Sequence, residues 1–181
     1  MSKKRQLLID TALDLFYHHG VKTIGINEII KTSGVAKRTL YSHFASKEAL
    51  IVAALTQRHQ RFMAWLDSRL AETKSDHDVI EKLFTGLGGW FAGQETELGN
   101  FRGCFFINTS AEFSDHDSDI AQYCAYHKDE VRKLIAAKLC GQKPYLLDAV
   151  CLMKEGAITT AYMTGQTTSI TDNAIKILTR L

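Results

Sequence analysis

Residues 25–48, GINEIIKTSGVAKRTLYSHFASKE, decide the fold of this chain. Three isoleucines at i, i+3 and i+4 spacing give residues 26–32 one apolar side, and this pattern predicts a short amphipathic helix. Gly34 is expected to end that helix, because only glycine takes the left-handed helix-end conformation without strain. Val35 follows at once and is expected to fill the corner before the next helix.

A second short helix is predicted over residues 36–43, with Leu40 and Phe44 as its buried residues. Its remaining side chains have donors for phosphates or base edges, and they are Lys37, Arg38, Thr39, Tyr41, Ser42 and His43. Two short helices joined by a glycine turn, the second of them rich in donors, are the layout of a helix-turn-helix that reads double-stranded DNA.

The charge of the chain is unevenly distributed. Residues 1–50 hold eight Lys and Arg against four Asp and Glu, a net charge of +4, whereas the other 131 residues hold fourteen against sixteen, a net charge of −2. A polyanion responds to the local field within about a Debye length, roughly 8–10 Å, rather than to the average over the chain. The basic N-terminal part is therefore expected to meet nucleic acid.

The same region closely resembles the DNA-binding part of the TetR/AcrR repressors. The matching positions cover about the first third of the chain and are residues 8–16, Gly20, Ile29, Gly34, Val35, residues 39–41, His43, Phe44 and residues 47–50. Two positions depart from the usual pattern: Gly25 stands where a Ser or Thr commonly caps the first reading helix, and Ile30 stands where a small alanine is usual. Neither departure removes a DNA contact, and Gly at an N-cap costs roughly a few tenths of a kcal/mol relative to Ser or Thr.

The resemblance implies that Thr39, Tyr41 and Lys47 contact DNA phosphates. Lys47 would lie at the start of the following helix, where its ammonium joins the positive helix end in holding a backbone phosphate. For Tyr41 the alternative is an ordinary half-buried aromatic, and for Thr39 it is an ordinary surface residue.

Other polar residues of the two short helices are further candidates. Lys37, Arg38 and Ser42 occupy the outward side of the second helix, where base identity would be read, and a solvated side chain is the alternative for each. His43 is expected either to bond to a phosphate or to pack. Asn27, on the first short helix, is a candidate for a phosphate or base contact.

Almost the whole chain is expected to be helical, since alternating apolar runs with hairpin dipeptides are missing and Pro occurs once, at position 144, where it opens a helix. The predicted helices span residues 3–19, 26–32, 36–43, 46–74, 76–91, 103–113, 119–139, 145–164 and 169–181. The fold class is therefore all-α with about nine helices, the number that the resemblance also implies. We expect a three-helix DNA-binding head at residues 1–46, joined by a long helix to a ligand-binding and dimerisation body at residues 47–181.

The resemblance implies that the body binds a small-molecule effector. The candidate effector residues are aromatic, thiol or polar side chains, with ordinary core packing as the alternative, and they are Trp65, Trp90, Cys104, Phe105, Asn108, Glu112 and Tyr126. Three glycines within four positions, Gly86, Gly88 and Gly89, either leave room for a ligand, permit a kink or allow close packing.

Gly103 and Cys104 open a predicted helix in a way that resembles a subgroup of the same family. In one hypothesis Cys104 is a small apolar residue beside an aromatic cavity, and Asn108 or Glu112 offers polar contacts to an organic molecule. In the other, the positive helix start and Arg102 favour the thiolate of Cys104, which then reacts with electrophiles or oxidants.

The last two predicted helices carry an apolar surface with few charges, and such a surface needs a partner. Small residues in the first of them would let two copies approach closely, which predicts an isologous homodimer. The candidate dimer residues are Leu146, Val150, Met153, Gly156, Ala157, Ala161, Ile175 and Leu178.

Several other classes of protein lack support in the sequence. No phosphate-cradling glycine loop, nucleophile elbow or paired-carboxylate motif is present, so neither an enzyme nor a cofactor is predicted. The four cysteines are widely spaced without a CxxC pair, which indicates buried, reduced thiols rather than a metal site or a disulfide framework. No apolar run approaches the roughly 20 residues that span a bilayer, and we expect a cytoplasmic protein without a membrane partner.

Together these features predict a ligand-responsive transcriptional regulator, expected to be a repressor, that binds a palindromic DNA operator as a homodimer. An effector would move the long helix and change the separation of the two heads away from one DNA turn, about 34–36 Å. The alternatives are an all-helical ligand or protein-interaction module without operator function, and a thiol-dependent enzyme.

Overall fold

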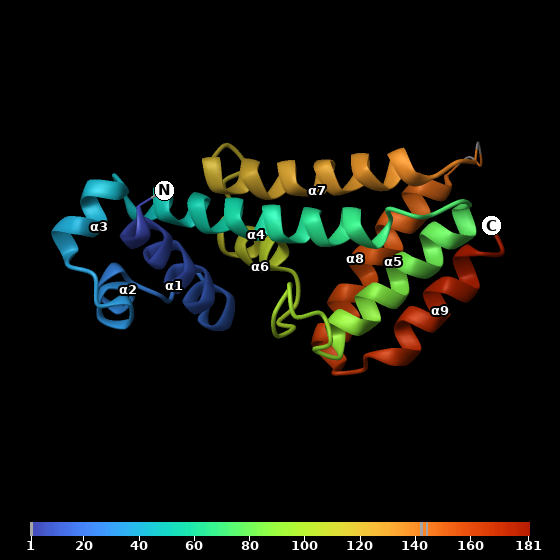
Figure 1. Cartoon of the computed structure of the whole chain (residues 1–181), viewed down its shortest axis with the longest axis horizontal. Coiled ribbons are helices and arrows are strands. Elements are labelled where there is room, and N and C mark those ends of the chain that lie inside the picture. The colour runs from blue at the N-terminus through green and yellow to red at the C-terminus, as the bar shows by residue number, and fades with distance from the viewer. Residues whose placement is uncertain (1, 142, 144) are drawn as a thin grey trace. The chain divides into compact units, whose positions relative to one another are not determined.

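The computed structural model describes residues 2–141, 143 and 145–181 (Figure 1). In this described part it contains nine α-helices and no strand, so the predicted all-α fold is confirmed. The helices are α1 (Lys3–His19), α2 (Ile26–Ser33), α3 (Lys37–His43), α4 (Lys47–Arg69), α5 (Asp76–Phe91), α6 (Phe105–Glu112), α7 (Asp119–Lys138), α8 (Leu146–Thr164) and α9 (Thr168–Leu178). Pro144, expected to open the eighth helix, lies outside the described residues. Of the described helices, none has the length and apolar character needed to cross a membrane.

Some predicted helix boundaries are wrong, and the ninth helix, for example, ends at Leu178 rather than at residue 181. The fourth helix ends at Arg69 rather than at residue 74, because the chain turns at Leu70, which is buried, and the Ala71 amide bonds back to the carbonyl of Ser68 at 3.4 Å. The sixth helix begins at Phe105 rather than at residue 103, because Gly103 has a φ of 77°, outside the helical region.

The chain forms two compact units. Unit 1 comprises Met1–Gln60 and Phe105–His127, and unit 2 comprises Arg61–Cys104 and Lys128–Leu181. Helices α4 and α7 have residues in both units, whereas each other helix belongs to one unit.

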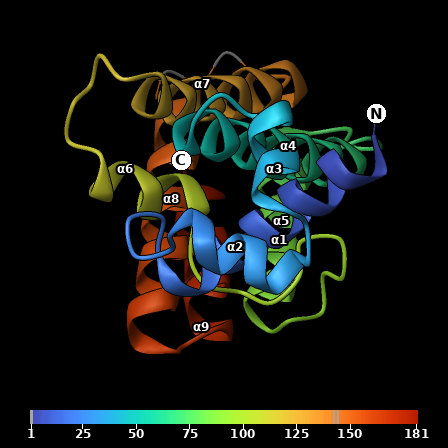
Figure 2. The same cartoon turned by 90° about the vertical axis from the view of Figure 1, so that its left-hand side faces the viewer.

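In unit 1, α1 packs against α2 and α3, and α2 packs against α3 (Figure 2). The core of this group consists of buried apolar side chains, which are Leu8, Ala12, Phe16, Ile29, Leu40 and Phe44. Gly20 ends α1, where its amide donates to the carbonyl of Phe16 at 2.9 Å. Three short helices thus share one apolar core, and the chain leaves it at Lys47 to begin α4.

In unit 2, α5 packs against α8 and α9, and these two pack against each other (Figure 1). Helix α5 begins at a conventional cap, because the Ser75 hydroxyl accepts a hydrogen bond from the amide of Asp78 at 3.1 Å. Its buried residues supply much of the core and include Val79, Leu83, Phe84, Leu87 and Trp90.

The three glycines of α5 allow close packing. A Cβ built on each would meet a neighbouring side chain, namely Trp65 at 3.1 Å for Gly86, Thr171 at 3.0 Å for Gly88 and Glu95 at 2.7 Å for Gly89. The helix continues without a break through all three positions. Of the three interpretations that the sequence allowed, close packing is therefore the one that the structure supports.

Candidate nucleic-acid interface and effector region

The turn between α2 and α3 has the geometry that the glycine predicts. Gly34 has a φ of 68° and a ψ of 8°, a left-handed conformation, and its amide donates to the carbonyl of Ile30 at 2.9 Å. The amide of Val35 donates to the hydroxyl of Ser33 at 3.3 Å, and the Val35 side chain is buried. Gly25 precedes α2 and provides no side-chain cap. The direction of α3 is thus set by a tight turn with a buried residue at its corner.

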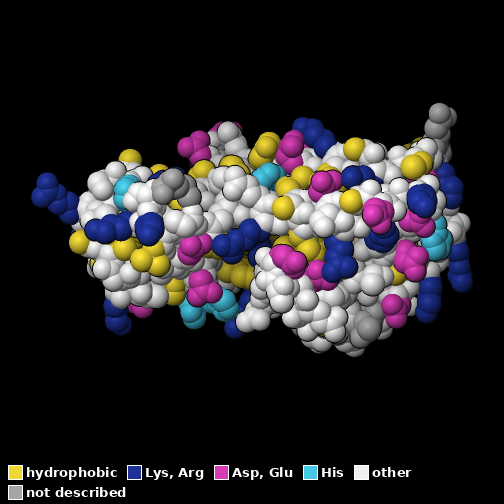
Figure 3. Space-filling model, viewed as in Figure 1, with side chains coloured by type: hydrophobic (Ala, Val, Ile, Leu, Met, Phe, Trp, Pro, Cys, Tyr) yellow, Lys and Arg dark blue, Asp and Glu magenta, His cyan; other side chains and the backbone are white. Residues whose placement is uncertain are grey.

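The outward side of α3 carries most of the predicted DNA-contacting residues. Lys37, Arg38, Tyr41 and Ser42 are exposed, Thr39 and His43 are half-buried, and Asn27 is exposed on α2. The Ser42 hydroxyl donates to the carbonyl of Thr39 at 2.8 Å, so it is already bonded within the helix. Lys and Arg side chains are spread over the surface of the α1–α3 group (Figure 3). Helix α3 therefore has one anchored side and one open side rich in donors.

Lys47 stands at the first position of α4, as expected for a phosphate contact. Its ammonium, however, donates to the backbone carbonyl of Val21 at 2.7 Å. Burial lowers the pKa of Lys47 below its ordinary value, and the carboxylates of Glu48 and Glu112 offset part of that effect. The side chain thus already binds the turn between α1 and α2.

Glu112, a candidate effector residue, binds the same turn. One carboxylate oxygen accepts from the amide of Val21 at 2.8 Å, and the other accepts from the amide of Lys22 at 2.6 Å. These partners lie about ninety positions earlier in the chain. No local sequence pattern could indicate such a contact.

The remaining candidate effector residues are divided between the two units. Trp65, Trp90 and Cys104 belong to unit 2, and Phe105, Asn108 and Tyr126 belong to unit 1. Trp90 and Phe105 are almost completely buried, which favours core packing for these two. Tyr126 is 47% exposed and lies beside His59, with ring centroids 5.4 Å apart.

Unit 2 contains a groove of about 950 Å³ between α4, α5 and the segment that follows α5. Its walls carry both signs of charge, and the lining residues are Arg61, Ala64, Trp65, Ser68, Arg69, Glu81, Lys82, Thr85, Glu95 and Glu97. Glu95 is only 6% exposed, accepts from the indole N–H of Trp65 at 2.7 Å and forms an ion pair with Arg69. Sequence reasoning named Trp65 and missed Glu95, because a carboxylate in a polar loop carries no sign of burial.

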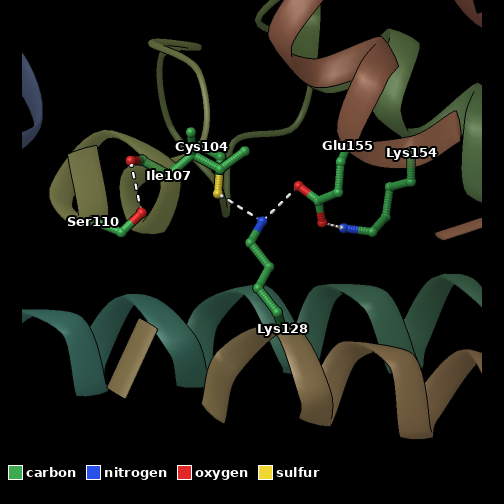
Figure 4. Close-up of polar contacts among 6 residues, drawn as sticks. All are labelled: Cys104, Ile107, Ser110, Lys128, Lys154 and Glu155. Atoms are coloured by element: carbon green, nitrogen blue, oxygen red, sulfur yellow. Dashed lines mark hydrogen bonds and ion pairs between the residues drawn. The ribbon is translucent and has the colours of Figure 1, made fainter. Parts of the chain in front are cut away.

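Cys104 belongs to a cluster of polar side chains in unit 2 (Figure 4). The ammonium of Lys128, on α7, lies 3.3 Å from the sulfur of Cys104 and 2.6 Å from an oxygen of Glu155. The other oxygen of Glu155 pairs with Lys154, a lysine that is 2% exposed. No sequence pattern connects these residues, which come from three separate segments.

The charges of this cluster stabilise one another. Burial lowers the pKa of Lys128, but the neighbouring Cys104 and Glu155 outweigh burial and raise the pKa above its ordinary value. Burial likewise raises the pKa of Glu155, but Lys154 and Lys128 outweigh it and hold the pKa below the ordinary value. The cluster therefore keeps a cation beside the sulfur of Cys104.

The cysteines are free in the described part of the chain. Cys104 and Cys124 are buried and Cys151 is half-buried, whereas Cys140 is exposed. The expectation of buried thiols is thus wrong for Cys140, which follows the end of α7.

The candidate dimer residues divide into two groups. Five of them are covered by the chain itself, and these are Leu146, Val150, Ala157, Ala161 and Leu178. Met153 and Ile175 are half-buried, and Gly156 is exposed with no atom within 4 Å of a Cβ built on it. Apolar residues with a period of three to four show which side of a helix is buried, but they do not show whether the chain's own core or a partner covers it. Here most of the candidate dimer residues face the chain's own core.

Other apolar side chains of α8 and α9 lie at the surface. Leu152 is 75% exposed and Met163 is 78% exposed, and together with Gly156 they form one outward side of α8 at positions i, i+4 and i+11. On α9, Ile177 is 49% exposed. These residues form the outward apolar side of α8 and α9.

Two short helices joined at a left-handed glycine, with a buried corner residue and an open row of donors, form a helix-turn-helix, an arrangement that many DNA-binding proteins share. Residues 8–54 match the family model described as bacterial regulatory proteins, tetR family. The region of the chain that contains the helix-turn-helix therefore matches this family.

Two relatives come from Escherichia coli strain K12. The chain is 30% identical to the HTH-type transcriptional repressor ComR over 118 residues, which are 65% of this chain and 54% of ComR. It is 28% identical to the HTH-type transcriptional repressor NemR over 117 residues, which are 64% of this chain and 57% of NemR. The chain thus spans a little over half the length of these relatives.

Solved structures share the fold over almost the whole chain. The reduced form of E. coli NemR has a TM-score of 0.84 at 22% identity, covering 99% of this chain and 97% of that one. FadR from Bacillus subtilis, in complex with stearoyl-CoA, has a TM-score of 0.71 at 16% identity and covers 96% of each chain. At these identities the likeness establishes the fold.

Proposed function

We propose that the chain is a ligand-responsive transcriptional repressor that binds a palindromic DNA operator as a homodimer and leaves it when a small molecule binds. In this proposal residues 1–46 form the DNA-binding head, residues 47–181 form the ligand-binding and dimerisation body, and the protein acts in the cytoplasm. The observation that carries the proposal is the open row of donors on α3, held at a tight turn by buried side chains on the opposite side.

DNA recognition follows from the two sides of α3. The major groove of B-DNA, about 12 Å wide, admits one helix, and base edges there are read by side chains that point outward from it. Lys37 and Arg38 are exposed at the N-terminus of α3. In a helix-turn-helix protein, the N-terminal residues of the recognition helix contact the base edges. Tyr41, which is exposed further along the same helix, is proposed to contact the phosphate backbone.

Homodimer formation is supported by the outward apolar side of α8 and α9. An exposed apolar stripe that includes Leu152 and Met163 lowers the solubility of the protein unless a partner covers it. Gly156 lies between these two residues and has no side chain, so the backbone of a second copy can approach closely. We propose that a second copy covers this side in an isologous contact. Two heads would then meet two half-sites of an operator.

The effector is proposed to bind in the groove of unit 2. Sites for small molecules typically measure about 300–1,000 Å³ and combine apolar walls with a few polar groups. The groove has such a volume, an indole in its wall and the buried carboxylate of Glu95. In the relative FadR the bound molecule is stearoyl-CoA, so a protein of this fold accommodates an organic ligand.

A second candidate for the switch is the thiol of Cys104, and the contact with Lys128 favours it. The ammonium of Lys128 lies 3.3 Å from the sulfur, and a cation beside a cysteine is typical of reactive thiols. In this candidate the thiolate adds to the C=C bond of an electrophile, a C–S bond forms, and the resulting carbanion takes a proton from water. Cys104 is 8% exposed, so access to the sulfur limits this reaction.

DNA binding is tested by selecting bound duplexes from a random pool. We expect a two-fold symmetric site whose affinity falls linearly with salt on a log–log plot. Lys37→Ala and Arg38→Ala should each change base preference at a defined position by about 1–3 kcal/mol, whereas Tyr41→Ala should weaken binding to all sequences alike. The same loss on every sequence for all three variants would contradict the assigned roles, and a failure to select any site would contradict the function.

Assembly is tested by light scattering at micromolar concentration. We expect the wild type to be a dimer and Gly156→Arg to be a monomer that binds the operator weakly, because the new side chain separates the two α8 helices. Ala137→Arg, at an exposed position of α7, adds the same charge away from the proposed interface and should remain dimeric. A monomeric wild type that still binds its palindrome tightly would contradict the proposal.

The two candidates for the switch are separated by Cys104→Ser. If a ligand in the groove is the switch, this variant should still be released from the operator by a non-reactive compound that releases the wild type. If the thiol is the switch, N-ethylmaleimide should release the wild type and leave Cys104→Ser bound, and Lys128→Met should slow alkylation of Cys104 relative to Lys133→Met at an exposed position. Slow alkylation of Cys104 together with operator binding unaffected by N-ethylmaleimide would eliminate the thiol candidate.

A further inference from the structure

Three hydrogen bonds hold one short piece of backbone between α1 and α2. The amides of Val21 and Lys22 donate to the two oxygens of Glu112, at 2.8 Å and 2.6 Å. On the other side of Val21, the ammonium of Lys47 donates to its carbonyl at 2.7 Å. We call Glu112, Lys47 and the backbone of residues 21 and 22 the turn clamp.

Residues on both sides of the turn favour these contacts. Gly20 has a φ of 87°, and a Cβ built on it would lie 3.2 Å from an oxygen of Glu112, so a glycine at this position lets the carboxylate come close. The ammonium of Lys22 lies over the ring of Phe113, 5.4 Å from its centroid. All three clamp bonds have an ionised partner, and such bonds are roughly twice as strong as neutral ones.

The turn clamp joins the ends of four helices. Residues 20–25 connect the end of α1 to the start of α2, Lys47 is the first residue of α4, and Glu112 is the last residue of α6. Three residues connect α3 to α4. The α2–α3 pair is therefore fixed at one end by this short connection and at the other by the turn clamp.

We propose that Glu112 is a positioning residue for DNA binding: with Lys47 it fixes the turn before α2, and a shift of α6 that moves its carboxylate reduces operator affinity. This inference rests on the proposed function. When the turn clamp opens, the α2–α3 pair occupies several orientations. The apparent dissociation constant for the operator then rises, because a smaller fraction of the protein has the orientation that binds DNA. Lys47 then acts mainly through Val21 and not as an independent phosphate contact.

The sign of one mutational effect separates this role from simple electrostatics. Glu112→Gln removes a negative charge from a region that meets a polyanion, so long-range electrostatics alone would strengthen DNA binding. The clamp inference predicts weaker binding instead, because glutamine has an NH2 donor in place of one of the two oxygens that accept from Val21 and Lys22, so one backbone amide loses its acceptor. Glu48 is the matched control, since it is exposed, neighbours Lys47 and makes none of the three clamp bonds.

The experiment measures operator affinity by fluorescence anisotropy on the full chain, at a temperature where circular dichroism shows every variant folded. We expect Glu112→Gln to weaken binding about tenfold or more, as the loss of a charged hydrogen bond implies. Glu48→Gln should bind as tightly as wild type or more tightly. Glu112→Asp, which keeps the charge with one methylene fewer, should recover part of the loss.

A double variant tests whether Lys47 acts through the clamp. If Lys47→Met and Glu112→Gln break one shared device, the double variant should lose less affinity than the sum of the two single losses. If the two losses of binding free energy are strictly additive, Lys47 acts independently of Glu112, as a phosphate contact would, and its proposed role in the turn clamp is wrong.

Hydrogen exchange of backbone amides, measured by NMR, tests whether the turn clamp is closed in the absence of DNA. In Glu112→Gln the amides of Val21 and Lys22 should exchange faster, while those of Ile29 and Leu40 keep their protection. General loss of protection would indicate a merely structural role and overturn the inference, as would a Glu112→Gln variant that binds the operator as well as Glu48→Gln does. A wild type that selects no operator at all would instead overturn the proposed function, and the positioning role with it.

Discussion

Helix α3 has seven residues, and a helix of that length is not stable in water by itself. Its shape and direction therefore depend on the buried side of the helix, above all on Leu40, which has no exposed surface. Burying one leucine contributes about 1.5–3 kcal/mol, a large share of the stability of so small an element. Gly34 and Val35 add a second constraint, since they set the angle at which α3 leaves α2. Every proposed DNA contact on the open side rests on this anchoring.

A similar constraint acts on the turn between α1 and α2, which residues far along the chain bind. The group of α1, α2 and α3 has a small core, and its connecting turn is held from outside by Glu112 of α6 and Lys47 of α4. A charged side chain that binds two backbone amides fixes that backbone more tightly than an apolar contact does, because hydrogen bonds are directional. Movement of α6 or of the start of α4 would therefore act on the head directly.

Local patterns in the sequence predicted much of the architecture. The all-α fold, the glycine turn and the open donors of α3 follow from helical period, a left-handed glycine and residue type, all of which operate over a few positions. The pattern also predicted which residues anchor α3, since Leu40 and Phe44 are buried. What these signals share is that each depends only on close neighbours in the chain.

The features that the sequence did not reveal depend on distant neighbours. Glu112 binds amides about ninety positions away, and the buried Glu95 bonds to Trp65 and Arg69 of α4. Periodicity found an apolar stripe on α8, but residues such as Val150 face the chain's own core while Leu152 faces outward. The end of α4 likewise coincides with the burial of Leu70, which helix propensity does not predict. In each case the deciding partner came from tertiary packing.

The central claim is that α3 and its turn meet DNA while unit 2 does not. Hydrogen–deuterium exchange of the full chain, with and without its selected operator, tests this most directly. Amides that lie in an interface with DNA lose access to solvent, and those of a short exposed helix exchange readily in the free protein. The account predicts that the operator slows exchange in residues 25–47, most of all in α3, and leaves α5 and the groove unchanged. An operator complex in which α3 exchanges as fast as in the free protein, or in which protection is confined to unit 2, would contradict it.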